Sequence, residues 1–213
     1  MRNVLITGGS GGIASGITYE LKKLNCEVIK PSRAYLDVTD NMSINSFFDS
    51  NSKVDVLINN AGAIYTQPLK DSDTWLWENV VRVNLLGTYR MTRAALRANK
   101  KTVIINISSM SAYQYFENFS AYASSKAGIV AMTKCLAQEG VKAYSVCPGG
   151  VDTPFRDKLM KNATEKEKNR SHFGKDDLLD PKEVGQIVSD ILQEKYDNGS
   201  SILIRKNDIF EVR

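Results

Sequence analysis

Two residues that could move a proton stand one helical turn apart in this chain. Tyr122 and Lys126 fall four residues apart within the helical pattern Ser120–Glu139, and residues at this spacing share one helix face. A tyrosine has an ordinary pKa of about 10, and a neighbouring ammonium favours its ionised form. Ser109, which closes the preceding strand-like run, could hold a substrate oxygen beside the phenol. The spacing indicates general acid–base chemistry, and the alternative is a buried aromatic residue with a solvated lysine.

A glycine-rich turn between the first strand-like run and the first helical pattern provides a second candidate site. It reads Thr7-Gly8-Gly9-Ser10-Gly11-Gly12-Ile13-Ala14. Glycines permit positive φ and a close backbone approach, and a helix N-terminus offers free N–H groups to a pyrophosphate. Two dinucleotide spacings fit, G-x-G-x-x-A from Gly9 and T-G-x-x-x-G-I from Thr7. No lysine follows as in a mononucleotide loop, so we expect a dinucleotide site, and the alternative is a flexible turn.

The elements that must position these residues alternate along the chain. Short apolar runs are typical of strands buried on both faces, and amphipathic runs are typical of helices. The predicted strands are Asn3–Thr7, Glu27–Lys30, Val54–Asn59, Thr102–Ser108 and Lys142–Cys147, and the predicted helices are Gly12–Leu24, Ser43–Ser50, Thr74–Asn99, Ser120–Glu139 and Pro181–Glu194. This order predicts one α/β domain over residues 1–213, a doubly wound parallel sheet (Rossmann fold) with helices on both faces. Ile202–Arg205 and Ile209–Val212 predict a last strand or a small hairpin.

Composition argues against several classes of protein. The net charge of +4 is too small to indicate nucleic-acid binding, and no apolar run approaches the roughly 20 residues of a membrane span. Cys26, Cys135 and Cys147 lie far apart among apolar neighbours, which predicts reduced thiols packed in the core of a cytoplasmic protein. His172 is the single histidine and no C-x-x-C spacing occurs. We therefore expect neither a metal site nor a Ser-His-Asp triad.

Together these motifs resemble the short-chain dehydrogenase/reductase family, in its compact single-domain branch, over nearly the whole chain. Thr7–Ile13 is similar to its nucleotide fingerprint, and Asn60-Ala61-Gly62 to the turn that flanks its cofactor. Asn106–Ser109, followed by Tyr122 and Lys126, resembles its catalytic segment. Trp77–Asn84 resembles the helix with its catalytic asparagine, and Pro148–Thr153 the turn that contacts the nicotinamide carboxamide.

The resemblance implies hydride transfer between a nicotinamide cofactor and a carbonyl or secondary alcohol. Tyr122 would be the general acid/base, and Lys126 would lower its pKa, together with a cationic nicotinamide, and anchor the ribose. Ser109 would orient the carbonyl, and Asn84 would hold a water in the proton relay. The implied cofactor-binding residues are Gly8, Ser10, Gly12, Ile13, Asn60, Ala61, Gly62, Tyr122, Lys126, Pro148, Gly149, Val151 and Thr153. A homodimer or homotetramer is implied through Thr74–Asn99 and Ser120–Glu139.

The run after the second predicted strand bears on the choice between NADP and NAD. An NAD site places an acidic residue about 20 residues past the glycines, whereas this chain reads Pro31-Ser32-Arg33 with no acid until Asp37. The Arg33 guanidinium and the Ser32 hydroxyl could bind a 2′-phosphate, while Asp37 and Val38 would lie beside the adenine. We therefore expect NADP, with NAD as the second candidate. The alternative is that Arg33 is a solvated turn residue.

Three departures from the family pattern stand out. Ala14 occupies the place of the usual last glycine. The Lys30–Asp37 stretch is so short that we expect no room for the usual helix between the second and third strands, and hence a less enclosed adenine side. The C-terminal region is also trimmed, which argues against the usual C-terminal dimer contact.

Residues 154–180 are expected to form a lid over the substrate. Pro154–Lys175 holds seven basic and three acidic residues, an excess that could attract an anionic substrate; the alternative is an ordinary solvated helix. The aromatic residues of the loop before Tyr122 either line the substrate pocket or pack the loop against helices: Tyr113, Tyr115, Phe116 and Phe119. A catalytically silent nucleotide-binding regulator is the alternative function, although such proteins usually lose the tyrosine or the lysine.

Overall fold

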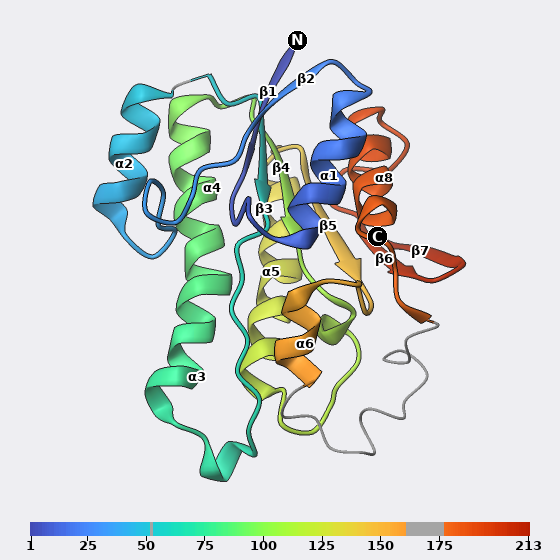
Figure 1. Cartoon of the computed structure of the whole chain (residues 1–213). Coiled ribbons are helices and arrows are strands. Elements are labelled where there is room, and N and C mark those ends of the chain that lie inside the picture. The colour runs from blue at the N-terminus through green and yellow to red at the C-terminus, as the bar shows by residue number, and fades with distance from the viewer. Residues whose placement is uncertain (52, 161–176) are drawn as a thin grey trace.

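A single twisted sheet runs through the computed structural model, which describes residues 1–51, 53–160 and 177–213 (Figure 1). Its strands are β1 (Arg2–Ile6), β2 (Cys26–Ile29), β3 (Val56–Asn59), β4 (Val103–Ile107), β5 (Ala143–Pro148), β6 (Ser201–Arg205) and β7 (Asp208–Val212). Their order is β2-β1-β3-β4-β5-β6-β7, and only β7 pairs antiparallel to its neighbour in this described sheet. The strand order reverses between β1 and β3, and such a switch point opens a ligand crevice at the carboxyl ends of the strands.

Helices cover both faces of the sheet because neighbouring strand residues point to opposite sides. Figure 1 shows α1 (Gly12–Lys22) and α8 (Pro181–Leu192) on one side and α2 (Asn41–Ser50) and α4 (Gly87–Ala98) on the other. The remaining described helices are α3 (Thr74–Val81), α5 (Ser120–Gln138), α6 (Pro154–Met160), the π-helical turn η2 (Arg82–Leu86) and the short 3-10 turns η1 (Leu69–Asp71) and η3 (Met110–Ala112). The predicted doubly wound fold is therefore confirmed.

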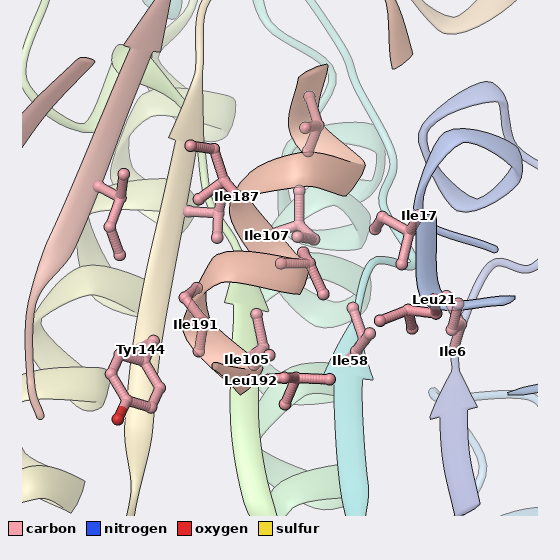
Figure 2. Packing of buried hydrophobic residues seen from close by; sticks show 14 of the residues in the cluster. Ile6, Ile17, Leu21, Ile58, Ile105, Ile107, Tyr144, Ile187, Ile191 and Leu192 are labelled. Carbon is pink, nitrogen blue, oxygen red and sulfur yellow. The ribbon is translucent and has the colours of Figure 1, made fainter. Parts of the chain in front are cut away.

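Two apolar cores follow this alternation of strand side chains. Ile6 of β1, Ile17 of α1 and Ile187 of α8 belong to one buried cluster, part of which Figure 2 draws, whereas Leu5, the neighbour of Ile6, belongs with Phe47 of α2 to a cluster on the other face. All of these side chains are buried. Burial of an aliphatic side chain of this size contributes about 1.5–3 kcal/mol to folding, so these two cores fix the strands whose ends carry the site.

The sequence predictions of strands and helices hold with two exceptions. The five strands lie within two residues of their predicted bounds, and the chain ends in the hairpin β6–β7. The predicted helix Thr74–Asn99 is divided by η2 into α3 and α4. The expectation of no helix between the second and third strands is wrong. Lys30–Asp37 contains no helix, but α2 follows it before β3, in the place of the predicted helix Ser43–Ser50.

The cysteines are free thiols, but they do not share one environment. Cys147 is buried and Cys26 is half-buried, whereas Cys135 is exposed on α5. The prediction that all three pack in a core is therefore wrong for Cys135, whose apolar sequence neighbours turn to other faces of the helix. Within the described residues, no helix is long and apolar enough to cross a membrane, and no group of three or more His, Cys, Asp or Glu side chains could hold a metal ion.

Helices α1 and α8 approach each other through two glycines. A Cβ added at Gly16 would overlap the Pro181 carbonyl, and one added at Gly185 would lie 2.5 Å from the Gly16 carbonyl oxygen. Neither obstacle is a flexible side chain, so the helices would have to separate. This contact brings the helix that follows the glycine-rich turn against the helix that follows residues 154–180.

We expect Gly16→Ala to lower the free energy of unfolding by about 1–3 kcal/mol, the usual effect of overpacking a tight contact. Thermal unfolding without cofactor measures it. Gly149→Ala is the matched control, because the added methyl group would meet nothing closer than 3.4 Å. Equal melting temperatures for Gly16→Ala and the wild type would show that the two helices are free to move apart.

Candidate active site

A cavity of about 590 Å³ opens at the carboxyl ends of the central strands. It joins the glycine-rich turn, the turn after β3, the end of β4, the start of α5 and the turn after β5. The predicted site residues that line it are Gly8, Ser10, Gly12, Ile13, Asn60, Ala61, Gly62, Ser109, Tyr122, Lys126, Pro148, Gly149, Val151 and Thr153. Residues from five separate parts of the chain therefore meet at one place. The predicted residues Ser32, Arg33, Asp37, Val38 and Asn84 do not line this cavity.

The glycine-rich turn has the geometry that a pyrophosphate needs. Gly8 has a φ of +64°, and a Cβ there would lie 2.8 Å from the Ala61 Cα atom. A Cβ at Gly12 would overlap the Thr153 side chain. No side chain caps the N-terminus of α1 at Gly11, so the first N–H groups of this helix stay free for an anion. These observations fit a dinucleotide cofactor.

Thr7 connects the glycine-rich turn to the turn after β3. Its hydroxyl accepts hydrogen bonds from the backbone N–H groups of Asn60 and Ala61, both at 3.0 Å. The Asn60 side-chain amide in turn donates to the carbonyl oxygens of Thr7 and Gly8 at 3.0 and 3.1 Å. Thr7 is thus a positioning residue that the sequence reasoning assigned only to the motif as a whole.

Asn84 lies in the π-helical turn η2, and such turns often mark functional positions in helices. Its side chain is fully buried. The carboxamide oxygen accepts from the Ala63 N–H at 2.7 Å, and the amide nitrogen donates to the Ala63 carbonyl and to the Ser125 hydroxyl, both at 3.0 Å. Asn84 therefore anchors the turn after β3 to α5. Ser125 was missed from the sequence, because a serine inside a helix carries no distinctive signal.

Tyr122 and Lys126 share one face of α5, as their spacing predicts. The Lys126 ammonium nitrogen lies 5.6 Å from the centre of the Tyr122 ring and donates to the Ile107 carbonyl at 2.8 Å. An ammonium has three N–H donors, so two stay available for ribose hydroxyls. Both side chains are buried, with exposed fractions of 7% for Tyr122 and 5% for Lys126.

Burial dominates the ionisation of this pair. It raises the pKa of Tyr122 to about 12, although a hydrogen bond with the Ser109 side chain acts in the opposite direction. Burial also lowers the pKa of Lys126 to about 8. The expectation that the pKa of Tyr122 falls toward working pH is therefore wrong for the protein alone, since removing the phenolate from water outweighs the nearby ammonium. The Ser109 hydroxyl is itself held by the Ser111 N–H at 3.1 Å.

The residues predicted for the adenine side lie at the exposed edge beyond β2. The Arg33 Nε atom donates to the Asp37 carboxylate at 3.0 Å, and both Ser32 and Arg33 are exposed. Burial of the Asp37 carboxylate acts to raise its pKa, but hydrogen bonds from Thr39 and Arg33 outweigh burial and hold the pKa below its ordinary value. The Val38 side chain packs in the core with α2 and α4. Arg33 thus has a carboxylate partner, a contact that the sequence reasoning did not anticipate.

The loop before Tyr122 divides its aromatic residues between two roles. Phe116 lines the cavity, whereas Phe119 is buried in a small core with Tyr122. Tyr113 packs against a separate cluster that contains Met110 and Leu203, and Tyr115 is exposed. Phe155 of α6 also lines the cavity, with its ring centre 6.3 Å from that of Tyr122. Both alternatives considered for this loop are therefore partly correct.

The two ends of the segment between β5 and α8 lie side by side. Val151 and Leu179 form an isolated parallel bridge, with the Leu179 N–H donating to the Gly150 carbonyl at 2.8 Å and the Asp152 N–H to the Leu179 carbonyl at 3.0 Å. Asp180 then caps α8. The predicted lid at 154–180 begins with α6, but residues 161–176, with most of its basic side chains and His172, lie outside the described residues.

Comparisons with known proteins agree with this geometry. The family model for short chain dehydrogenase matches residues 33–167. The chain is 30% identical over 196 residues to 3-oxoacyl-(acyl-carrier-protein) reductase FabG of Aquifex aeolicus, a match that covers 87% of this chain and 77% of that protein. It is 36% identical over 127 residues to dehydrogenase/reductase SDR family member 6 of Rattus norvegicus, covering 56% of this chain and 52% of the rat protein.

Solved structures share the whole fold. The structure of ElxO with NADP bound has a TM-score of 0.82 at 26% identity and covers 95% of this chain and 96% of that one. The ligand-free aldohexose dehydrogenase of Thermoplasma acidophilum has a TM-score of 0.83 at 25% identity and covers 95% and 92%. With the family model, the relatives and the cavity in agreement, this chain belongs to the short-chain dehydrogenase/reductase family.

Proposed function

We propose that this chain is an NADP(H)-dependent oxidoreductase of the carbonyl reductase type, with Tyr122 as its general acid/base. The observation that carries the proposal is the meeting of Ser109, Tyr122 and Lys126 with the glycine-rich turn in one cavity. A relative named as a 3-oxoacyl reductase and a similar structure with NADP bound support the reaction and the cofactor. Nothing favours a silent regulator, because all four catalytic candidates, Asn84 included, are present.

The residues divide the reaction among them. When bound, the nicotinamide supplies the hydride that reaches the carbonyl carbon. The Ser109 hydroxyl donates to the carbonyl oxygen and orients it. Tyr122 gives its proton to that oxygen as the alcohol forms, and the Lys126 ammonium stabilises the phenolate that is left. Asn84 uses its amide N–H groups within the protein, so a relay water would bind through an oxygen of this residue.

An activity screen tests the proposal. Aliphatic ketones, aromatic ketones and 3-oxo esters are offered with NADPH and with NADH, and the loss of reduced-cofactor absorbance is followed. We expect turnover with at least one class and faster turnover with NADPH. Binding of both cofactors without turnover of any of these classes would overturn the enzyme assignment in favour of a regulator.

Arg33 should select NADP(H), because its guanidinium can pair with a 2′-phosphate. Arg33→Ala is expected to weaken NADPH binding by about tenfold or more, the usual worth of a charge-assisted hydrogen bond, and to leave NADH binding nearly unchanged. Fluorescence titration of each reduced cofactor measures this. Lys22→Ala, which removes an equal charge from the last turn of α1, is the control. Equal losses for the two cofactors would show that Arg33 serves only to hold Asp37.

We also propose a homo-oligomer that assembles through α3 and α4. The support is a set of exposed apolar side chains along these helices. Trp75 of α3 is 64% exposed, and Leu86 of η2 and Tyr89 of α4 are also exposed. A groove between these helices is lined by Trp75, Trp77, Leu86 and Arg90. Light scattering of the purified chain gives the mass, and a monomer at micromolar concentration would contradict this assembly.

A further inference from the structure

Arg205, the last residue of β6, brings a cation to the wall of the cavity. Its Nε atom is buried, and no hydrogen-bond acceptor for it is found among the residues that the structure describes. The Asp208 carboxylate, opposite Arg205 in the β6–β7 register, is exposed and does not accept from this atom. Arg205 as a whole is half-buried, but a buried N–H donor without an acceptor is costly, so the presence of this one at a cavity points to a ligand that supplies an acceptor.

The strand places Arg205 on the substrate side of the cavity. Ile202 and Ile204 pack with α1 and α8, whereas Leu203 packs with Met110 on the opposite face. Successive side chains alternate, so Arg205 follows Leu203 toward the face where Met110 succeeds Ser109 in the chain. The free N–H groups of α1, which would take the cofactor pyrophosphate, belong to the other face. Arg205 is therefore better placed for the substrate than for the cofactor phosphates.

The charged residues around this cavity all have one sign in the part of the chain that the structure describes. Lys126, Arg156 and Arg205 line it, and no Asp or Glu does. Lys126 is required for the reaction at Tyr122, and Arg156 lies next to Phe155, whose ring faces Tyr122. Such a cavity favours a negatively charged ligand, because clefts lined by one sign of charge focus the field of those charges.

We infer that the carbonyl substrate carries an oxyanion, a carboxylate or a phosphate, which Arg205 binds through its Nε–H and one terminal N–H. The inference rests on the proposed carbonyl reduction. The guanidinium edge presents two parallel N–H groups, and these match two oxygens of either anion. The basic composition of residues 154–175 predicts an anionic substrate, and Arg205 is a residue within the described structure that could bind it.

Matched pairs of carbonyl compounds test this inference. The pairs are 4-acetylbenzoate with its methyl ester, levulinate with its methyl ester, and dihydroxyacetone phosphate with dihydroxyacetone. We expect the wild type to prefer the anion in at least one pair by kcat/KM, and Arg205→Gln to lower that value about ten- to a hundredfold for the anion only. The third pair distinguishes a phosphate from a carboxylate. Arg205→Lys, which keeps the charge but loses the paired N–H groups, should recover only part of the loss.

A binding measurement separates this inference from the proposed reaction. Calorimetric titration of the same anions into enzyme saturated with NADP⁺ reports binding without turnover, and Arg205→Gln should lose the affinity that the wild type shows. Lys206→Gln removes an equal charge from the adjoining turn, outside the cavity lining, and should bind as the wild type does. If no compound of either kind is reduced, the proposed function fails, while the titration still decides the role of Arg205.

Three results would overturn the assignment of Arg205. The first is a wild type without preference for the anion in any pair, by rate or by titration. The second is an equal loss for the charged and the neutral member in Arg205→Gln. The third is a rise in the dissociation constant for NADPH as large as the loss for the anion, since Arg205 would then bind a cofactor phosphate. Equal melting temperatures of Arg205→Gln and the wild type exclude misfolding as the cause of a loss.

Discussion

Tyr122→Phe is expected to lower kcat by about 10²–10⁴-fold, the range in which a positioned acid or base usually contributes. The ring stays in its small core with Phe119, so the protein should fold and bind NADPH with nearly unchanged affinity. Steady-state kinetics and cofactor fluorescence titration measure the two quantities. The cavity offers no second phenol, because Tyr122 is the one tyrosine among its described lining residues.

Tyr115→Phe is the matched control for this change. It removes an equivalent hydroxyl from the loop that precedes α5, at a side chain that is 77% exposed, and its kcat should equal that of the wild type. If Tyr122→Phe kept more than about a third of wild-type kcat, with chemistry rate-limiting, proton transfer through Tyr122 would be wrong.

Lys126→Met should have two effects of opposite sign. Activity should fall by about a hundredfold or more, and cofactor affinity should fall with it, because the ammonium beside the phenol and its free N–H donors are lost. The protein without cofactor should instead become more stable at pH 7. Burial lowers the pKa of Lys126 to about 8 from its ordinary value of 10.5, so holding this charge inside costs about 3 kcal/mol.

The pH dependence of stability separates this cost from other effects of Lys126→Met. Between pH 8 and 10.5 the unfolded chain binds more protons at Lys126 than the folded one, so the wild type gains stability from this residue as the pH rises through that window. The advantage of the variant should therefore be largest below pH 8 and shrink toward pH 10.5. Lys134→Met, on the same helix with its ammonium bonded at the surface, is the control for the loss of a lysine from α5. A variant less stable than the wild type at pH 7 would contradict the argument.

The fold could be predicted in most of its parts because its signals are local. Continuous apolar strands and amphipathic helices repeat along the chain, and the glycines of the first turn stand where α1 must begin. The π-helical turn at Arg82–Leu86 could not be seen, since five residues of a wider turn leave the apolar pattern nearly unchanged. The presence of a helix between β2 and β3 could not be predicted from the short stretch Lys30–Asp37 alone, because the helix begins after this stretch, at Asn41.

The site was predictable where sequence spacing equals proximity in space. Tyr122 and Lys126 lie one turn apart on α5, and this fixed their relation. Arg205 carried no signal, because only the pairing of β6 with β5 brings the end of the last parallel strand to the cavity that Ser109 also lines. The pKa of Tyr122 could not be predicted for the same reason, because the burial of this side chain depends on Val80, Phe155 and other residues distant in the sequence.

The bridge between Val151 and Leu179 makes the intervening segment an exchangeable cassette. Its two ends are already joined by backbone hydrogen bonds, so the loop-closure entropy of a longer insert costs about 0.6 kcal/mol for each doubling of length. The sheet, the glycine-rich turn and Tyr122 need not move. Substrate range can therefore diverge by exchange of the part of this segment that follows α6, provided that Thr153, which lies against Gly12, and Phe155, which packs beside Tyr122, are kept.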